Sequence, residues 1–126
     1  MSWTIALLPG DGIGPEVTRV ARAALEQAAL QTGIKLTFTT HPFGGASIDA
    51  HGEPLTAETL HACQTADAVF LGAVGGPKWD AAPERPEAGL LALRKGLGVF
   101  ANLRPTRVHP ALSDRSPLRQ ELVNGA

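Results

Sequence analysis

Apolar runs alternate with segments of helical periodicity along the first hundred residues of the chain. Residues 3–8 form a short apolar run, residues 15–32 carry apolar side chains at helical spacing, and residues 35–40 alternate between polar and apolar positions. Pro15 favours the start of a helix and Gly33 favours its end. This pattern predicts a strand, a helix and a second strand, in that order.

The alternation continues beyond residue 40. The predicted elements there are a loop at 43–46, a helix over 55–66 with Thr56 as its N-cap, a strand over 68–74, a helix over 87–95, a buried strand over 99–103 and a last helix from 116. Strands that alternate with helices predict an α/β protein with an open, mostly parallel sheet and flanking helices. In such a sheet, ligands bind at the loops that follow the carboxyl ends of the strands.

Composition and charge narrow the class of protein. Hydrophobic residues make up 44% of the 126 residues and charged residues 18%, as in a globular rather than a disordered chain. The net charge of −1 argues against nucleic acid and against an anionic membrane surface as partners, and no apolar stretch is long enough to cross a bilayer. A single cysteine, Cys63, fits a reducing cytoplasm and is interpreted as a small helix residue. The four histidines lack ligand-like spacing, so we expect no metal site built from them.

The first segment that can carry chemistry is the glycine-rich loop over residues 9–16. Glycines between a strand and a helix let the backbone approach a ligand closely. However, the dinucleotide fingerprint needs a glycine where this chain has Pro15, and no Walker A sequence follows. The loop is therefore either a structural turn, which the residues favour, or a phosphate-binding loop.

A second loop, rich in glycine and proline, covers residues 75–86. It is longer than a simple connection needs, and long loops in compact domains are often functional. Lys78 is suited to a phosphate and Trp79 to an apolar ring. The alternative is a solvated loop with a packed tryptophan, and composition alone does not separate the two.

The third segment is a stripe on the predicted helix over 87–95. Glu87, Leu90, Leu91 and Arg94 recur at helical spacing, and Arg104 follows the apolar run 99–103. Two arginines at element ends suit carboxylates, and the leucines would supply an apolar wall, which together match a small diacid with a branched hydrocarbon substituent. The alternative is an amphipathic helix with core leucines and a solvated arginine.

Four motifs in this chain resemble those of a known family. They are LPGDGIGPE at residues 8–16, FGGASID at 43–49, GAVGGPKW at 72–79 and FANLRP at 100–105. In this order they resemble the decarboxylating β-hydroxyacid dehydrogenases, the isocitrate/isopropylmalate dehydrogenase family, and within it the branch that acts on 3-isopropylmalate. The resemblance covers essentially the whole chain and implies one incomplete part of that family's two-domain fold.

The resemblance implies roles for particular residues. Arg94 and Arg104 are expected to bind the malate carboxylates, and Leu90 to pack on the isopropyl group with Leu91 nearby, where isocitrate enzymes place polar residues. The loop from Gly76 to Glu87 is expected to contact NAD, with Glu87 near the nicotinamide. The cofactor-binding residues implied are Gly76, Pro77, Lys78, Trp79, Asp80, Ala81, Ala82, Pro83, Glu84, Arg85, Pro86 and Glu87.

The resemblance also implies an activity and its setting. The expected reaction is NAD-dependent oxidative decarboxylation of 3-isopropylmalate to 4-methyl-2-oxopentanoate in leucine biosynthesis, by a cytoplasmic homodimer that uses Mg²⁺ or Mn²⁺. The family's catalytic tyrosine and lysine and its metal-binding aspartates are expected outside this chain. Residues 1–99 would begin the first domain and residues 100–126 the second. Ala88 departs from the threonine of many family members, which predicts a modest effect on cofactor affinity.

Two alternatives stay open at this point. One is a non-catalytic, truncated product that binds a dicarboxylate or an intact subunit. The other is a relative that acts on homoisocitrate or tartrate, against which Leu90 and Leu91 argue. A chain limited to these residues is expected to be inactive by itself and poorly stable, because strand edges and apolar faces would be uncovered.

Overall fold

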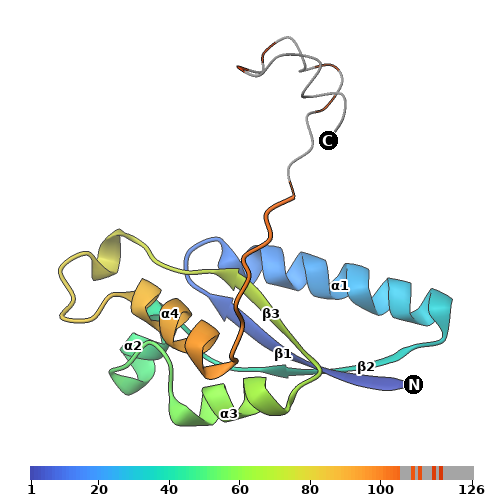
Figure 1. Cartoon of the computed structure of the whole chain (residues 1–126), viewed down its shortest axis with the longest axis horizontal. Coiled ribbons are helices and arrows are strands. Elements are labelled where there is room, and N and C mark those ends of the chain that lie inside the picture. Colours follow the sequence, from blue (N-terminus) through green and yellow to red (C-terminus); the bar gives the residue numbers. More distant parts are fainter. Residues whose placement is uncertain (106–108, 110, 112–114, 116, 118–126) are drawn as a thin grey trace.

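The computed structural model describes residues 1–105 and residues 109, 111, 115 and 117. Three strands and three helices follow one another in the order that the sequence pattern predicts, and a short helix, α2, and a 3₁₀ turn, η1, are added to them (Figure 1). The elements are β1 (Ser2–Gly10), α1 (Gly14–Thr32), β2 (Lys35–Thr40), α2 (Gly45–His51), α3 (Ala57–Thr65), β3 (Ala68–Ala73), a single 3₁₀ turn η1 (Pro77–Trp79) and α4 (Pro86–Gly96).

The sheet has β1 in its middle, with β2 on one side and β3 on the other. Both pairings are parallel, which confirms the predicted α/β class. Ser2 pairs with Lys35 at one end of the β1–β2 ladder, and Gly10 pairs with Ala73 at the far end of the β1–β3 ladder. The carboxyl ends of β1 and β3 therefore lie at the same edge of the sheet.

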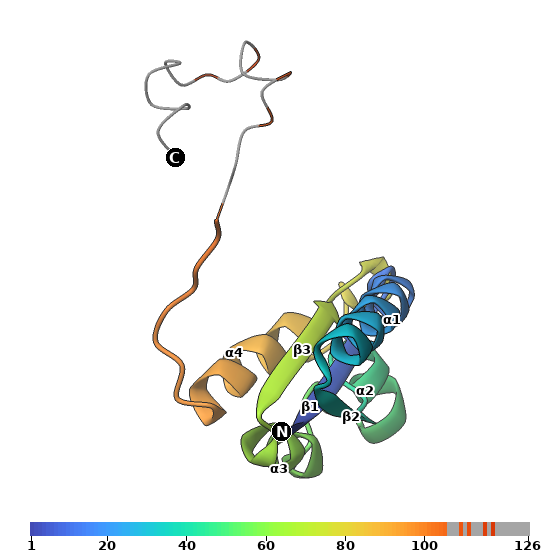
Figure 2. The same ribbon diagram turned by 90° about the vertical axis from the view of Figure 1, so that its right-hand side faces the viewer.

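Helices cover both faces of this sheet, and side chains of β1 point alternately to each face. Figure 2 shows α1 on one side of the sheet and α3 and α4 on the other. On the α3–α4 side, Ala6 and Leu8 form a buried cluster with Phe43, Cys63 and Leu93. The strand at the centre of the sheet is thus buried on both faces, as its continuous apolar run requires.

Several local signals in the sequence work as predicted. Gly33 ends α1 in the left-handed conformation, with φ of 70°. The Thr56 hydroxyl caps α3 by accepting from the backbone N–H of Thr59 at 3.1 Å. Cys63 is a buried residue of α3, and burial raises the pKa of its thiol, so the interpretation of Cys63 as a packing residue holds.

Helix α2 stands where the sequence pattern predicts only a loop. Two of its first-turn N–H groups, those of Gly45 and Ala46, donate to the carboxylate of Asp11. An N-terminal helix partner normally sits next to the helix in sequence, whereas Asp11 is 34 residues before Gly45. A local pattern cannot reveal a partner at that separation.

The predicted strand over 99–103 is wrong in the described structure. Residues 99–105 have no regular secondary structure, and Phe100 is fully exposed. They leave α4 and run away from the sheet (Figure 2, orange). An apolar run becomes a strand only when neighbouring backbone accepts and donates its hydrogen bonds, and these residues pair with none of the three described strands. The helix predicted from 116 falls outside the described residues.

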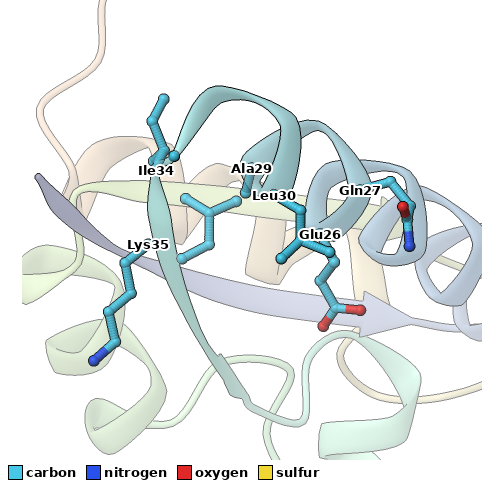
Figure 3. A pocket seen from close by; sticks show the side chains of 8 residues that line it. Glu26, Gln27, Ala29, Leu30, Ile34 and Lys35 are labelled. Carbon is cyan, nitrogen blue, oxygen red and sulfur yellow. The ribbon is translucent and has the colours of Figure 1, made fainter.

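A hollow of about 600 Å³ lies between the carboxyl-terminal half of α1 and β2. Figure 3 shows Leu30 within it and the charged side chains of Glu26 and Lys35 on opposite sides. Leu30 is 75% exposed, because α1 leans over β1 and β3 and leaves this side of β2 open.

The described helices include none that combines the length and apolar character needed to span a membrane.

Candidate functional site

The carboxyl edge of the sheet, between β1 and β3, is the natural place for a site. From β1 the chain passes through α1 to β2 on one side, and then through α2 and α3 to β3 on the other. Ligands of open α/β sheets bind at such a topological switch point. Here the loop after β1 and the loop after β3 meet, and both were singled out from the sequence.

The glycine-rich loop after β1 packs tightly against the end of β3. Gly10 has a φ of 72°, and a β-carbon there would overlap the carbonyl oxygen of Ala73. The N–H of Asp11 donates to that same oxygen at 2.7 Å, and the N–H of Gly14 donates to the Asp11 carbonyl at 2.8 Å. These N–H groups are therefore used inside the protein, which supports the structural turn over a phosphate-binding loop.

Asp11 is the polar centre of this edge. Its side chain is almost completely buried and accepts three backbone N–H groups. Gly45 and Gly75 donate to Oδ2 at 2.8 and 2.9 Å, and Ala46 donates to Oδ1 at 2.7 Å. One carboxylate thus joins the first loop, the start of α2 and the start of the loop after β3.

The loop after β3 has a second attachment, to Asp49 of α2. Lys78 donates to Oδ2 of Asp49 at 2.5 Å, and the indole N–H of Trp79 donates to Oδ1 at 3.2 Å. Hydrogen bonds from Lys78 and then Trp79 hold the pKa of Asp49 below its ordinary value. The Trp79 ring covers Gly45, where a β-carbon would overlap it, and the Lys78 ammonium lies 5.2 Å from the ring centre. Lys78 and Trp79 therefore fasten their own loop.

The rest of that loop faces outward. Asp80 and Arg85, five positions apart in the loop, form an exposed ion pair at 2.8 Å. Glu87, the first carboxylate of α4, places Oε1 2.6 Å from where a β-carbon of Gly75 would stand. A residue larger than glycine at position 75 would therefore displace Glu87, so the two ends of the loop meet.

Helix α4 divides the predicted stripe between the core and the surface. Leu90 packs against the buried cluster, whereas Leu91 is 67% exposed. Arg94 is half-buried in the last turn of α4, and no acidic side chain within the described residues forms an ion pair with it. The alternative in which both leucines are core residues is therefore wrong for Leu91.

Arg104 lies in the exposed segment that follows α4, not at the end of a strand. Because the predicted strand is absent there, the structure does not build a shared pocket from Arg94 and Arg104. The roles of both arginines stay predictions, as does the division of the chain at residue 99.

Within the described residues, no three histidine, cysteine or acidic side chains gather closely enough to hold a metal ion.

Sequence reasoning missed Asp11 and Asp49 as structural partners. Asp11 carried one available signal, since it is the only acidic residue in the glycine-rich turn between β1 and α1. Asp49 carried none, because only tertiary structure brings α2 beside Lys78 and Trp79.

The open parallel sheet with flanking helices defines an α/β protein, and the polar centre of its carboxyl edge lies at the switch point of the strand order. The family model described as Isocitrate/isopropylmalate dehydrogenase matches residues 4–126. The chain belongs to this family.

Among its relatives is the 3-isopropylmalate dehydrogenase of Anaeromyxobacter dehalogenans, 64% identical over 99% of this chain and 36% of the relative. The enzymes of the same name from Salinibacter ruber and Listeria innocua are 57% and 54% identical over 98% of this chain. The chain spans about a third of the length of the curated relatives that it matches.

Solved structures agree on the fold. The isocitrate dehydrogenase of Methylococcus capsulatus is 28% identical, with a TM-score of 0.62, over 76% of this chain and 26% of that protein. The beta-decarboxylating dehydrogenase of Thermococcus kodakarensis, in its apo form, is 33% identical, with a TM-score of 0.60, over 76% of this chain and 27% of that protein.

Proposed function

We propose that this chain forms the N-terminal part of an NAD-dependent 3-isopropylmalate dehydrogenase of leucine biosynthesis. The complete enzyme oxidises the substrate hydroxyl and removes a carboxylate to give 4-methyl-2-oxopentanoate. The observation that carries the proposal is the 64% identity to an enzyme of that name over almost the whole chain. A cytoplasmic location and a homodimer belong to the same proposal.

In this proposal helix α4 supplies the substrate selectivity. Arg94 binds a substrate carboxylate, and its partial burial without an acidic partner in the described residues supports that role. Leu90 lies one turn before Arg94 on the same side of the helix. It packs partly against the buried cluster, and in the proposal its remaining surface contacts the isopropyl group. In the complete enzyme, Arg104 of the segment that follows α4 binds a second carboxylate of the substrate.

The loop from Gly76 to Glu87 contributes to the NAD site. Its residues fit this use because they lie at the carboxyl edge of parallel strands, are mostly exposed, and are fastened at Gly75 and at Lys78 and Trp79. Bound NAD supplies the hydride acceptor. Residues 80–85, which are exposed except for the half-buried Ala82, and the Glu87 carboxylate are then the groups that contact it, while Lys78 and Trp79 hold the loop.

The metal is placed outside this chain in the proposal. When bound, Mg²⁺ or Mn²⁺ would supply Lewis-acid polarisation of substrate oxygen atoms, and acidic residues beyond position 126 would hold it. The part played by this chain is to orient the substrate through Arg94 and Arg104.

The first experiment measures the mass and the activity of the protein as its own cell makes it. Purified native protein is tested with 3-isopropylmalate, isocitrate, homoisocitrate and tartrate, each with NAD and a divalent metal. We expect a mass well above 13.1 kDa and a kcat/KM highest for 3-isopropylmalate. A native mass of 13.1 kDa without turnover would favour the non-catalytic product, and a preference for homoisocitrate or tartrate would identify a different member of the family.

A further inference from the structure

The two loops of the candidate site are joined through a single side chain. Asp11 is only 3% exposed, and its carboxylate accepts N–H groups from Gly45, Ala46 and Gly75, which are 34 to 64 residues away in sequence. Gly75 is the residue from which the loop up to Glu87 departs. The position of Gly75 relative to α2 is therefore fixed by Asp11.

The arrangement requires a carboxylate at this place. Three N–H donors converge on two oxygens, and an ionised carboxylate accepts all three without offering a hydrogen of its own. Backbone packs directly against it, since a β-carbon on Gly44 would lie 2.6 Å from Oδ2. Removing the acceptor would leave the buried N–H of Gly45 without a partner, together with two part-buried N–H groups, which is costly. The contact is therefore specific in both chemistry and shape.

The hydrogen bonds of Asp49 fix the loop at a second place, beyond Gly75. Asp49 of α2 binds Lys78 and Trp79, and α2 is itself held by Asp11 through Gly45 and Ala46. Residues 75–79 are thus fixed to α2, and only the outer part of the loop is left to face a ligand.

From this geometry we infer that Asp11 is a positioning residue for the nucleotide-binding loop. It does not touch the nucleotide. It holds Gly75, and through Gly75 the loop up to Glu87, against α2 in the geometry that accepts NAD. That the ligand of this loop is a nucleotide rests on the proposed function, whereas the holding of the loop by Asp11 does not.

The first part of the test measures the loop without any ligand, in the complete protein. We compare wild type with Asp11→Ala and Asp11→Asn, and use Asp67→Asn as the matched control. Asp67 also accepts a backbone N–H, that of Thr4 at 2.7 Å, but at the opposite end of β1. The readouts are hydrogen exchange of the Gly75 amide and the emission of Trp79 in a background where Trp3 and any other tryptophan of the complete protein are replaced by phenylalanine.

The expected order of Gly75 exchange is fastest in Asp11→Ala and intermediate in Asp11→Asn. The asparagine oxygen can still accept from Gly45 and Gly75, which share Oδ2, but its amino group would then face the N–H of Ala46. The Trp79 emission should change in the same order, and Asp67→Asn should match wild type. Unchanged Gly75 exchange in Asp11→Ala, or in Asp11→Asn where the alanine variant does not fold, would overturn the inference.

The second part measures turnover. In Asp11→Ala the KM for NAD should rise roughly tenfold to a hundredfold, which is the effect of losing a charge-assisted hydrogen bond, while the KM for 3-isopropylmalate changes little. A merely structural role would lower the active fraction, and hence the apparent kcat, with both KM values unchanged. That result would overturn the positioning role. If wild type does not use NAD, the proposed function fails, and the exchange and emission data still decide whether Asp11 holds the loop.

Discussion

The carboxyl edge of the sheet and the hollow beside α1 are built in different ways. At the edge, buried Asp11 accepts three backbone N–H groups and Asp49 accepts two side chains. The hollow encloses about 600 Å³, but its charged side chains lie at the rim, and the nearest ion pair, Arg22 with Glu26, is exposed and within one helix. A site must fix the orientation of its ligand, which needs converging polar groups more than volume. The comparison therefore favours the edge as the place of the proposed site.

The largest effect is expected when Arg94 of α4, a residue of the proposed site, is compared with Arg22 beside the hollow. Arg94→Ala in the complete enzyme should lower kcat/KM for the substrate. The activation free energy that kcat/KM reports should rise by about 2–5 kcal/mol, because a carboxylate loses its partner in a desolvated site. Arg22→Ala, in the exposed pair beside the hollow, should leave kcat/KM unchanged. Steady-state kinetics at low substrate concentration measures both. Near-normal turnover by Arg94→Ala would remove this residue from the site.

A second, smaller effect is expected where Trp79 covers α2. Gly45→Ala places a β-carbon on the indole ring and should destabilise the protein by about 1–3 kcal/mol, as overpacking usually does. The emission of Trp79 should shift as the ring is displaced.

The matched control for this substitution is the same change in a Trp79→Ala background. Without the ring, Gly45→Ala should cost much less, because the three atoms nearest to the β-carbon all belong to Trp79. Denaturant melts of the four proteins give the coupling between the two positions. Additive effects would mean that Trp79 does not rest on Gly45.

Acid should release the second attachment of the loop. The pKa of Asp49 is lowered by its hydrogen bonds from Lys78 and Trp79, so the charged carboxylate favours the attached loop. This contribution is complete above the ordinary carboxyl pKa of about 3.9 and is lost as the pH falls through the lowered value. Trp79 emission should therefore stay constant from neutral pH to about pH 5 and change only below about pH 4. In Asp49→Asn this transition should be absent.

The smallest effect is expected in the hollow itself. Leu30 is mostly exposed, so Leu30→Ala should change the free energy of unfolding by no more than about 0.5 kcal/mol and should not affect the KM for NAD. Thermal melts and steady-state kinetics check both statements. A marked loss of activity would contradict the comparison between the two regions and would point to a ligand in the hollow.

The sequence by itself determined the order and type of the main elements. The strand over 35–40 has the bounds that its alternation predicts, and α1 ends at the glycine that favours a helix end. These features depend on periodicity, on proline and glycine, and on one N-cap, all of which act over a few residues. The four motifs likewise identified the family, because long motifs in a fixed order are specific.

Tertiary structure alone decided how the candidate site is assembled. Helix α2 forms beside Asp11, and Lys78 and Trp79 turn to Asp49, because folding brings together residues that are 29 to 64 positions apart. The apolar run 99–103 remains without a strand because a strand depends on backbone from elsewhere in the chain. Local patterns fix local hydrogen bonds, whereas long-range partners become known only once the sheet and its helices are in place.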